Sequence, residues 1–315
     1  MKSANVVFLI DIQNGFARNG LTEPQGGSLY VPGGENAGEP AARLIRNLSG
    51  STIVLSQDFH PADHISFATN HAGVLPFSNI YLRCKDDGPY LAIGAAVDGK
   101  VLAVSANERG NITHTFVPTS WCRPRWKVPS SKPCGRGIAS SKPKARCSSI
   151  LSMAELPASL IGQLEAPDVR PVLNGSDSRG NSFYVVRKGV QRDLDSYGIA
   201  IENDGVSKTE APNVFRSIAL RLKTDGINRA VIHIGGLATN FCVEFSHADL
   251  CREFVPALHA NGIESRIHLL TDVSYGIPIA KPDRSWPDLG TAPSRMASMG
   301  TKACTTEDVA RDGLD

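Results

Sequence analysis

Short runs of apolar residues, rich in valine and isoleucine, recur along the chain and predict its strands. They show no strict alternation of apolar and polar positions, which is typical of parallel strands buried on both faces of a sheet. The runs that we expect to be strands cover 5–12, 52–56, 183–187, 230–234 and 267–271.

Segments with a helical period lie between these runs. Apolar residues at helical spacing predict helices over 41–48 and 213–223, and Gly226 follows the second one, where a glycine commonly ends a helix. Strands that alternate with helices predict an α/β fold with a doubly wound, mainly parallel sheet and helices on both faces. We expect a single domain over 1–315.

Most of the predicted strands end in residues that can carry chemistry. Asp11 closes the first run, Asp58 and His60 follow the second, Lys188 closes the third, and the fourth leads through two glycines to Cys242. Ligands of open α/β sheets bind in the crevice beyond the carboxyl ends of the strands. We therefore expect these distant residues to meet at one site.

Composition and charge narrow the class of partner. The formal net charge of +2 is too small to indicate nucleic acid or an anionic membrane as the main partner. The longest early apolar run, 6–10, is too short for a membrane span or a signal peptide. Seven cysteines without a CxxC pair argue against a disulfide framework. We expect a cytoplasmic protein with a small-molecule substrate, and a homo-oligomer is compatible with the sequence.

One stretch does not fit the α/β pattern. Between Glu108 and Glu155 there is no acidic residue, while lysine, arginine, serine and proline recur. We predict an irregular insertion over 117–165, for which three interpretations stay open: a basic segment that docks an acidic partner, a solvated disordered loop, or a gene-model error. The residues 279–315 are expected to be a loop, over 279–286, and a C-terminal tail, which after Asp288 either forms one last helix or is frayed.

Cys242 is the candidate nucleophile. It follows a predicted strand and precedes a predicted helix over 244–250, so its thiol would lie at a helix N-terminus, where the helix dipole favours the thiolate. The nearby backbone N–H groups could hold a developing oxyanion. The alternative is a structural cysteine that packs as a small apolar residue.

Lys188 and Asp11 are candidates to support that thiol. A lysine at a strand end would hold a positive charge near the sulfur, and a carboxylate could take the thiol proton and later deliver it to departing ammonia. For each residue the alternative is a solvated surface charge or a structural ion pair.

A possible metal site follows the second strand. Asp58 and His60 are two residues apart in an extended segment, so their side chains point the same way. A carboxylate and an imidazole suit a divalent metal such as Zn, Fe or Mn, and His64 could be a further ligand or could orient His60. The alternative is a polar turn after a strand.

Together these residues resemble the nicotinamidase/pyrazinamidase branch of the isochorismatase-like cysteine hydrolases. Several blocks, which occur in the family's order from about residue 5 to 275, carry the resemblance. The blocks are VFLIDIQNGF at 7–16, GGSLYVPGG at 26–34, SQDFHPADHISFA at 56–68, RKG at 187–189 with DSY at 195–197, and GLATNFCV at 236–243.

The resemblance implies roles for individual residues. Asp11, Lys188 and Cys242 would form a catalytic triad. A cis peptide bond before Ala238 would aim the amides of Ala238 and Cys242 at the oxyanion, and Phe16 would line the substrate pocket. The family also implies a divalent metal at Asp58, His60 and a further histidine.

The sequence departs from the family pattern at that further histidine. Members carry a Trp-Pro-x-His-Cys-Val block whose histidine is the remaining ligand, and no matching histidine occurs after Phe116. One explanation is a shifted reading frame or a retained intron between about 116 and 166. If the stretch is real, His64, His71 or His114 could stand in.

We therefore expect an amidohydrolase that converts nicotinamide to nicotinate and ammonia through a cysteine thioester. The metal block favours an aromatic amide, because isochorismatases proper lack it. Two alternatives stay open: a related cysteine hydrolase acting on another small amide or carbamoyl compound, and an inactive scaffold or binding protein.

Overall fold

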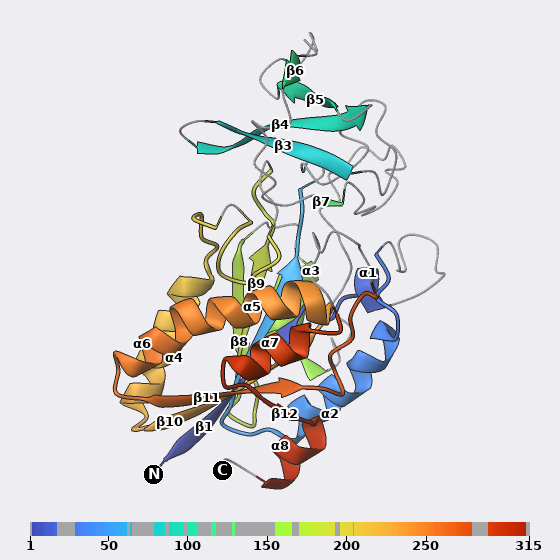
Figure 1. The fold of residues 1–315 in the computed structure, drawn as a ribbon. Coiled ribbons are helices and arrows are strands. Elements are labelled where there is room, and N and C mark those ends of the chain that lie inside the picture. The colour runs from blue at the N-terminus through green and yellow to red at the C-terminus, as the bar shows by residue number, and fades with distance from the viewer. Residues whose placement is uncertain are drawn as a thin grey trace.

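The fold of the chain is shown by a computed structural model (Figure 1). It describes residues 2–17, 29–61, 64, 155–165, 170–192, 196–203, 205–278 and 289–312, and the backbone of five further strands. The residues 279–286, expected to be a loop, lie outside this described part. No helix in the described ranges is long and apolar enough to cross a membrane.

A seven-stranded sheet forms the centre of the molecule. Its order is β12-β11-β10-β1-β2-β9-β8, and every neighbouring pair is parallel except β8 with β9. Five of these strands match the predicted runs. The strands are β1 (Ser3–Ile10), β2 (Thr52–Asp58), β8 (Val172–Ser176), β9 (Ser182–Lys188), β10 (Arg229–Gly236), β11 (Glu264–Leu270) and β12 (Lys302–Cys304).

Helices cover both faces of this sheet. The chain moves one way along the sheet from β1 to β2 and back the other way from β9 to β10, so right-handed crossovers put α2 (Gly38–Asn47) and α4 (Ala211–Thr224) on opposite faces. α8 (Thr306–Asp312) packs beside α2, and α6 (Val255–His259) packs beside α4. The predicted α/β class, with a doubly wound and mainly parallel sheet, is confirmed.

The remaining helical segments are short. They are α1 (Asn14–Ala17), the 3-10 helix η1 (Gly34–Ala37), α3 (Ala158–Glu165), the π-type turn η4 (Thr239–Val243), α5 (Glu244–Asp249), the π-type turn η5 (Leu250–Phe254) and α7 (Ala292–Ser298). The segments η4, α5, η5 and α6 follow one another without a break from Thr239 to His259.

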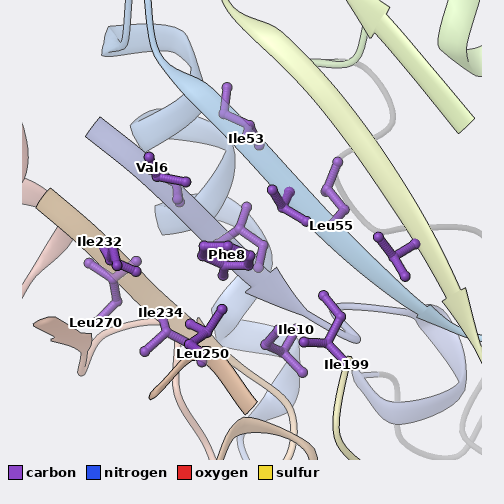
Figure 2. Close-up of a cluster of buried hydrophobic side chains, with 14 of the residues drawn as sticks. Val6, Phe8, Ile10, Ile53, Leu55, Ile199, Ile232, Ile234, Leu250 and Leu270 are labelled. Atoms are coloured by element: carbon purple, nitrogen blue, oxygen red, sulfur yellow. The ribbon is translucent and has the colours of Figure 1, made fainter. Parts of the chain in front are cut away.

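Aromatic and branched side chains fix the sheet against α4 and η5. Phe8 of β1 makes edge-on ring contacts with Phe215 of α4 and Phe254 of η5, with centroids 5.8 and 5.5 Å apart. All three rings are fully buried. Figure 2 shows Phe8 among the aliphatic side chains of the neighbouring strands, including Ile234, its partner on β10. This packing holds the carboxyl ends of β1 and β10 in a fixed relation.

A second sheet was not predicted. Its five strands are antiparallel in the order β6-β5-β4-β3-β7, and Figure 1 shows it apart from the seven-stranded sheet. The strands are β3 (Asn79–Lys85), β4 (Gly88–Val97), β5 (Lys100–Ser105), β6 (Thr115–Val117) and β7 (Val128–Pro129). The segment 88–97 is an apolar run that starts with glycine and proline, and 79–85 contains the apolar triplet at 80–82, so both segments carry an apolar strand pattern in the sequence.

Two predicted segments, 117–165 and 279–315, lie partly within the described residues. Most of the insertion predicted over 117–165 lies outside the described residues, and its insertion character stays a prediction. Its last part, however, contains α3, with Leu156 and Leu160 buried in the core. The predicted loop and tail at 279–315 contains α7, β12 and α8, because Met296 and Val309 bury apolar surface there. Residues 155–165 and 289–312 are therefore part of the folded unit.

A buried histidine makes the stability of this fold depend on pH. Burial lowers the pKa of His247, on α5, from 6.5 to about 4, and its Nε2 is hydrogen-bonded to Thr301 Oγ1 at 2.5 Å. Between about pH 6.5 and pH 4, His247 binds a proton in the unfolded chain but not in the folded chain, so lowering the pH favours unfolding. We expect the free energy of unfolding to fall by about 2 kcal/mol through His247 alone between about pH 7 and pH 5.

Urea unfolding at the two pH values measures this loss. His247→Gln should show a smaller loss by about that amount, whereas His259→Gln, at an exposed position of α6, should keep the full loss. Equal pH dependence in all three proteins would contradict the assignment to His247.

Candidate active site

Lys188 stands at the centre of a buried polar cluster. Its Nζ lies 3.0 Å from Asp11 Oδ2, 3.5 Å from Asp58 Oδ1 and 3.6 Å from Cys242 Sγ. It also donates a hydrogen bond of 2.7 Å to the carbonyl of Ser196. The Lys188 and Asp11 side chains are fully buried. The structure thus brings together the aspartate, lysine and cysteine that the sequence placed at three strand ends.

The carboxylates around Lys188 determine its charge. Burial by itself would lower the pKa of this lysine, but the charges of Asp11, Cys242 and Asp58 outweigh burial and hold the pKa well above its ordinary value. Lys188 therefore stays an ammonium ion within the cluster. An ammonium ion at this distance from Cys242 Sγ stabilises the thiolate form of that side chain.

Asp11 is held by its backbone and by one serine. It follows β1 with a positive φ of 48°, which only a small fraction of residues other than glycine adopt. Ser56 of β2 donates a hydrogen bond of 2.6 Å to Asp11 Oδ1, and the same hydroxyl accepts the Asp11 N–H at 3.0 Å. The carboxylate is thus fixed between Ser56 on one side and Lys188 on the other.

Cys242 lies in the first turn of the long helical stretch that starts at Thr239. The strand β10 reaches it through Gly236, whose φ is 140°, and a cis peptide bond joins Leu237 to Ala238, as the resemblance implies. A methyl group at Gly236 would overlap the carbonyl of Ile10, so the sharp path from β10 to the helix requires glycine. Ala238 and Cys242 are both buried.

Asp58 and His60 form the polar pair next to this cluster. His60 Nε2 lies 3.4 Å from Asp58 Oδ1, and His60 Nδ1 donates a hydrogen bond of 2.8 Å to the carbonyl of Gly189. Because a carbonyl can only accept, Nδ1 carries a proton, and Nε2 is the ring nitrogen that faces Asp58. The His60 ring packs directly over Gly189, whose φ is 66°, and a side chain there would overlap it. This arrangement fits two ligands of a divalent cation.

His64, the third predicted metal ligand, lies against the ring of His60. Its ring is stacked on that of His60, with centroids 3.8 Å apart and planes 2° from parallel. In the described part of the chain, Asp58, His60 and His64 are not a set whose donor atoms all lie within 4.8 Å of one another. His64 thus supports the His60 ring, and its role as a ligand stays a prediction. His71 and His114, the other stand-ins, lie outside the described residues.

Phe16, the predicted wall of the substrate pocket, lies on α1 a few residues after Asp11. It is half-buried and packs against the hydrophobic core. Its role in binding a substrate stays a prediction.

The structure adds supporting residues that the sequence did not single out. Gln13 accepts the Asp58 N–H at 2.8 Å and donates to the Asp58 carbonyl at 3.3 Å, which ties the end of β2 to the end of β1. Asp249 of α5 accepts the backbone N–H groups of Ala200 and Ile201 at 2.7 and 3.0 Å. It thereby holds the loop whose Ser196 carbonyl receives the Lys188 ammonium. Burial raises the pKa of Asp249 to about 6.

Asp11 and Asp58 place two buried carboxylates beside the Lys188 ammonium and the Cys242 thiol. A carboxylate and an imidazole, such as those of Asp58 and His60, are common ligands of divalent cations. Chemically, the cluster combines a nucleophile, a carboxylate that can accept a proton, and a fixed positive charge. A doubly wound α/β protein with this cluster at the carboxyl ends of β1, β9 and β10 has the features of a cysteine hydrolase.

Comparison of the whole sequence points to one group of such proteins. The chain is 26% identical over 253 residues to a nicotinamidase of Acinetobacter baylyi, an alignment that covers 79% of this chain and 76% of the relative. It is 40% identical over 74 residues to a nicotinamidase of Escherichia coli, covering 23% of this chain and 31% of that relative. No protein-family model matches the chain. The resemblance to nicotinamidases that the sequence blocks carry is confirmed.

Solved structures were also compared. A nicotinamidase/pyrazinamidase of Acinetobacter baumannii is 21% identical, with 97% of each chain covered and a TM-score of 0.48. The yeast nicotinamidase bound to the inhibitor nicotinaldehyde is 16% identical, with 96% of this chain and 99% of that chain covered and a TM-score of 0.48.

Proposed function

We propose that the chain is an amidohydrolase that converts nicotinamide to nicotinate and ammonia. The observation that carries the proposal is the buried Lys188 ammonium within 3.6 Å of both the Asp11 carboxylate and the Cys242 thiol. The sequence similarity to nicotinamidases supports the substrate. We place the reaction in the cytoplasm, where nicotinate would enter NAD salvage.

The reaction would begin with transfer of the thiol proton to Asp11. The Cys242 sulfur then attacks the amide carbon, and the carbonyl oxygen becomes an oxyanion for which the backbone N–H groups of Ala238 and Cys242 are the proposed donors. Asp11 returns the proton to the amide nitrogen, the C–N bond breaks, and ammonia leaves a thioester on Cys242.

Water completes the reaction. Asp11, now a carboxylate again, takes a proton from the water that attacks the thioester carbon, and the C–S bond breaks to release the acid and restore the thiol. Lys188 keeps its positive charge throughout and stabilises the sulfur each time it becomes anionic. Phe16 is the proposed apolar wall for the pyridine ring.

A divalent metal is the proposed cofactor of this site. Asp58 and His60 would hold it, and its chemistry would be to bind the pyridine nitrogen and so orient the amide toward Cys242. The supporting observation is that His60 Nε2 lies 3.4 Å from Asp58 Oδ1 while His60 Nδ1 is hydrogen-bonded to the carbonyl of Gly189, as the second ring nitrogen of a metal-bound histidine typically is.

The deciding experiment is ammonia release from nicotinamide by the purified full-length protein, with and without added Zn²⁺, Mn²⁺ or Fe²⁺. We expect one nicotinate for each ammonia. Absence of both products in every condition would overturn the proposal.

A second candidate function has one observation in its favour. In the sequence no histidine after Phe116 matches the family's remaining metal ligand, which suits a related cysteine hydrolase that works without the metal on another small amide or carbamoyl compound. A panel of such compounds, assayed for ammonia release, separates the two functions. An inactive scaffold would release ammonia from none of them and would leave Cys242 unreactive toward alkylating reagents.

Removal of the Asp58 carboxylate tests the metal. In the Asp58→Ala protein we expect the KM for nicotinamide to rise about 10- to 100-fold, with a smaller change in kcat, because a ligand that positions the substrate is lost. Added metal should no longer lower this KM. Asp225→Ala, at the exposed end of α4, serves as the control and should respond to metal like the parent. A KM of the parent value in the Asp58→Ala protein would count against metal binding here.

A further inference from the structure

A second group of possible metal ligands lies on the sheet, apart from the candidate active site. The group consists of His233, His268 and Cys304. Each of them offers one donor atom, and these three atoms lie within 4.8 Å of one another. His233 is at the middle of β10, His268 on β11 and Cys304 at the end of β12. These residues are on three adjacent strands, and none of them contributes to the Lys188 cluster.

Strand register explains why the three side chains meet. His233 is aligned with His268, and Cys304 is aligned with Leu270, two residues after His268. Aligned residues and residues two apart on a strand point to the same face of a sheet. His233 is also aligned with Val7, whose side chain points away from the face that Phe8 fills. All three ligands therefore lie on the face covered by α2 and α8.

The hydrogen bond of His233 leaves one ring nitrogen without a partner. His233 is almost fully buried, and its Nε2 donates a hydrogen bond of 3.0 Å to Asn5 Oδ1, an atom that can only accept. Its Nδ1 therefore carries a lone pair, and no described residue provides it with a hydrogen-bond donor. Burial, and then the neighbouring His268, lower the pKa of His233 to about 3, so the ring is neutral.

An unpaired buried imidazole nitrogen is unfavourable unless something binds it. Metal-bound histidines typically donate their other ring N–H to an oxygen that fixes the ring, as Asn5 does here. The two partners of His233 have suitable chemistry, since imidazole and thiol groups together select zinc and similar transition metals. The His233 and His268 rings meet edge-on with centroids 5.4 Å apart, and both His268 and Cys304 are half-buried.

The separation of the donors is compatible with one ion. A point equidistant from three donors 4.8 Å apart is about 2.8 Å from each, while zinc bonds measure about 2.0–2.3 Å. Binding of one zinc ion thus requires the donor atoms to move toward it by less than about 1 Å each. Small side-chain rotations produce shifts of this size. Their partial exposure leaves room for water as a fourth ligand.

We propose that His233, His268 and Cys304 bind a zinc-class transition-metal ion that joins β10, β11 and β12. Burial, and then Asp308 and Asp272, raise the pKa of Cys304 to about 12, so the free thiol holds its proton and binding releases that proton to solvent. The ion would anchor the C-terminal strand β12 to the strand that leads to Cys242. Its role is structural, and it does not depend on the proposed amidase activity.

Cobalt binding tests the site directly, because a cysteine ligand gives Co²⁺ a thiolate charge-transfer absorption in the near ultraviolet. The full-length Cys242→Ala protein, freed of metal by a chelator, is titrated with Co²⁺, so that the thiol of the candidate active site cannot contribute. We expect the absorption to appear, and to disappear in a protein that also carries Cys304→Ser. Cys251→Ser, at another half-buried cysteine, should keep it.

His268→Gln gives a second test that does not alter the cysteines. It should weaken Co²⁺ binding at least tenfold, while circular dichroism shows the same folded protein. Absence of the absorption in the Cys242→Ala parent would overturn the proposal. An unchanged absorption in the Cys304→Ser protein, or unchanged affinity in the His268→Gln protein, would do so as well.

Discussion

The Cys242→Ala protein is expected to release ammonia from nicotinamide at least about 10,000-fold more slowly than the parent, because no other group in the cluster can form the thioester. The substitution removes one sulfur atom from a buried position next to Lys188, and Ala238 and the helical turn keep their places. Binding of nicotinamide should therefore survive. Initial rates of ammonia release, together with calorimetric titration of nicotinamide, measure both quantities.

Cys251→Ser is the matched control for this variant. Cys251 is a half-buried cysteine on η5, on the same continuous helical stretch as Cys242 but outside the Lys188 cluster. The control should retain the parent rate within a few-fold. If the Cys242→Ala protein kept a tenth of the parent activity, the sulfur would not be the nucleophile and the proposed reaction would be wrong.

The Asp11→Asn protein is expected to lose activity by about 1,000- to 10,000-fold in kcat. Asparagine has nearly the same shape but cannot accept the thiol proton or return it to ammonia. It also removes the negative charge 3.0 Å from Lys188 Nζ, which leaves Asp58 as the remaining carboxylate partner of that ammonium. Steady-state rates of ammonia release over a range of nicotinamide concentrations give the effect on kcat.

Ser56→Ala provides a graded comparison for Asp11. It removes the hydroxyl that donates to Asp11 Oδ1 and accepts the Asp11 N–H, but it leaves the carboxylate in place. We expect a loss of about 10- to 100-fold in kcat. A larger loss in Ser56→Ala than in Asp11→Asn would show that the carboxylate acts through its position alone.

The main features of the site could be predicted because they follow from strand order. Asp11, Lys188 and Cys242 each come at or shortly after the carboxyl end of a buried apolar run, and parallel strands bring such ends to one edge. The α/β class follows from the same runs and from the helical segments between them. Neither inference requires the positions of individual atoms.

The supporting contacts could not be predicted in the same way. Whether Ser56 faces Asp11 depends on the register of β1 with β2, which apolar runs do not specify. From the sequence alone, Asp249 is an acidic residue of a predicted helix with no assigned contact. Only the path of the loop after Lys188 shows that it accepts hydrogen bonds from two backbone N–H groups. The stacking of His64 on His60 likewise depends on the turn between them.

The two edge strands of the seven-stranded sheet, β12 and β8, were not predicted either. β12 has only three residues, Lys302–Cys304, and lies at the sheet edge with two of them exposed, so it shows no apolar run. β8 is the antiparallel edge strand and is mostly polar. Edge strands bury little surface, and the apolar pattern that predicts central strands is therefore weak in them.

The two carboxylates beside Lys188 also bear on how a product would leave. A neutral amide carries no charge toward Asp11 and Asp58, whereas hydrolysis creates a carboxylate close to both. Like charges at short distance repel each other, and solvent screens them only weakly where the side chains are buried. The two carboxylates would thus favour departure of an anionic acid, while a cation held by Asp58 and His60 would oppose that departure.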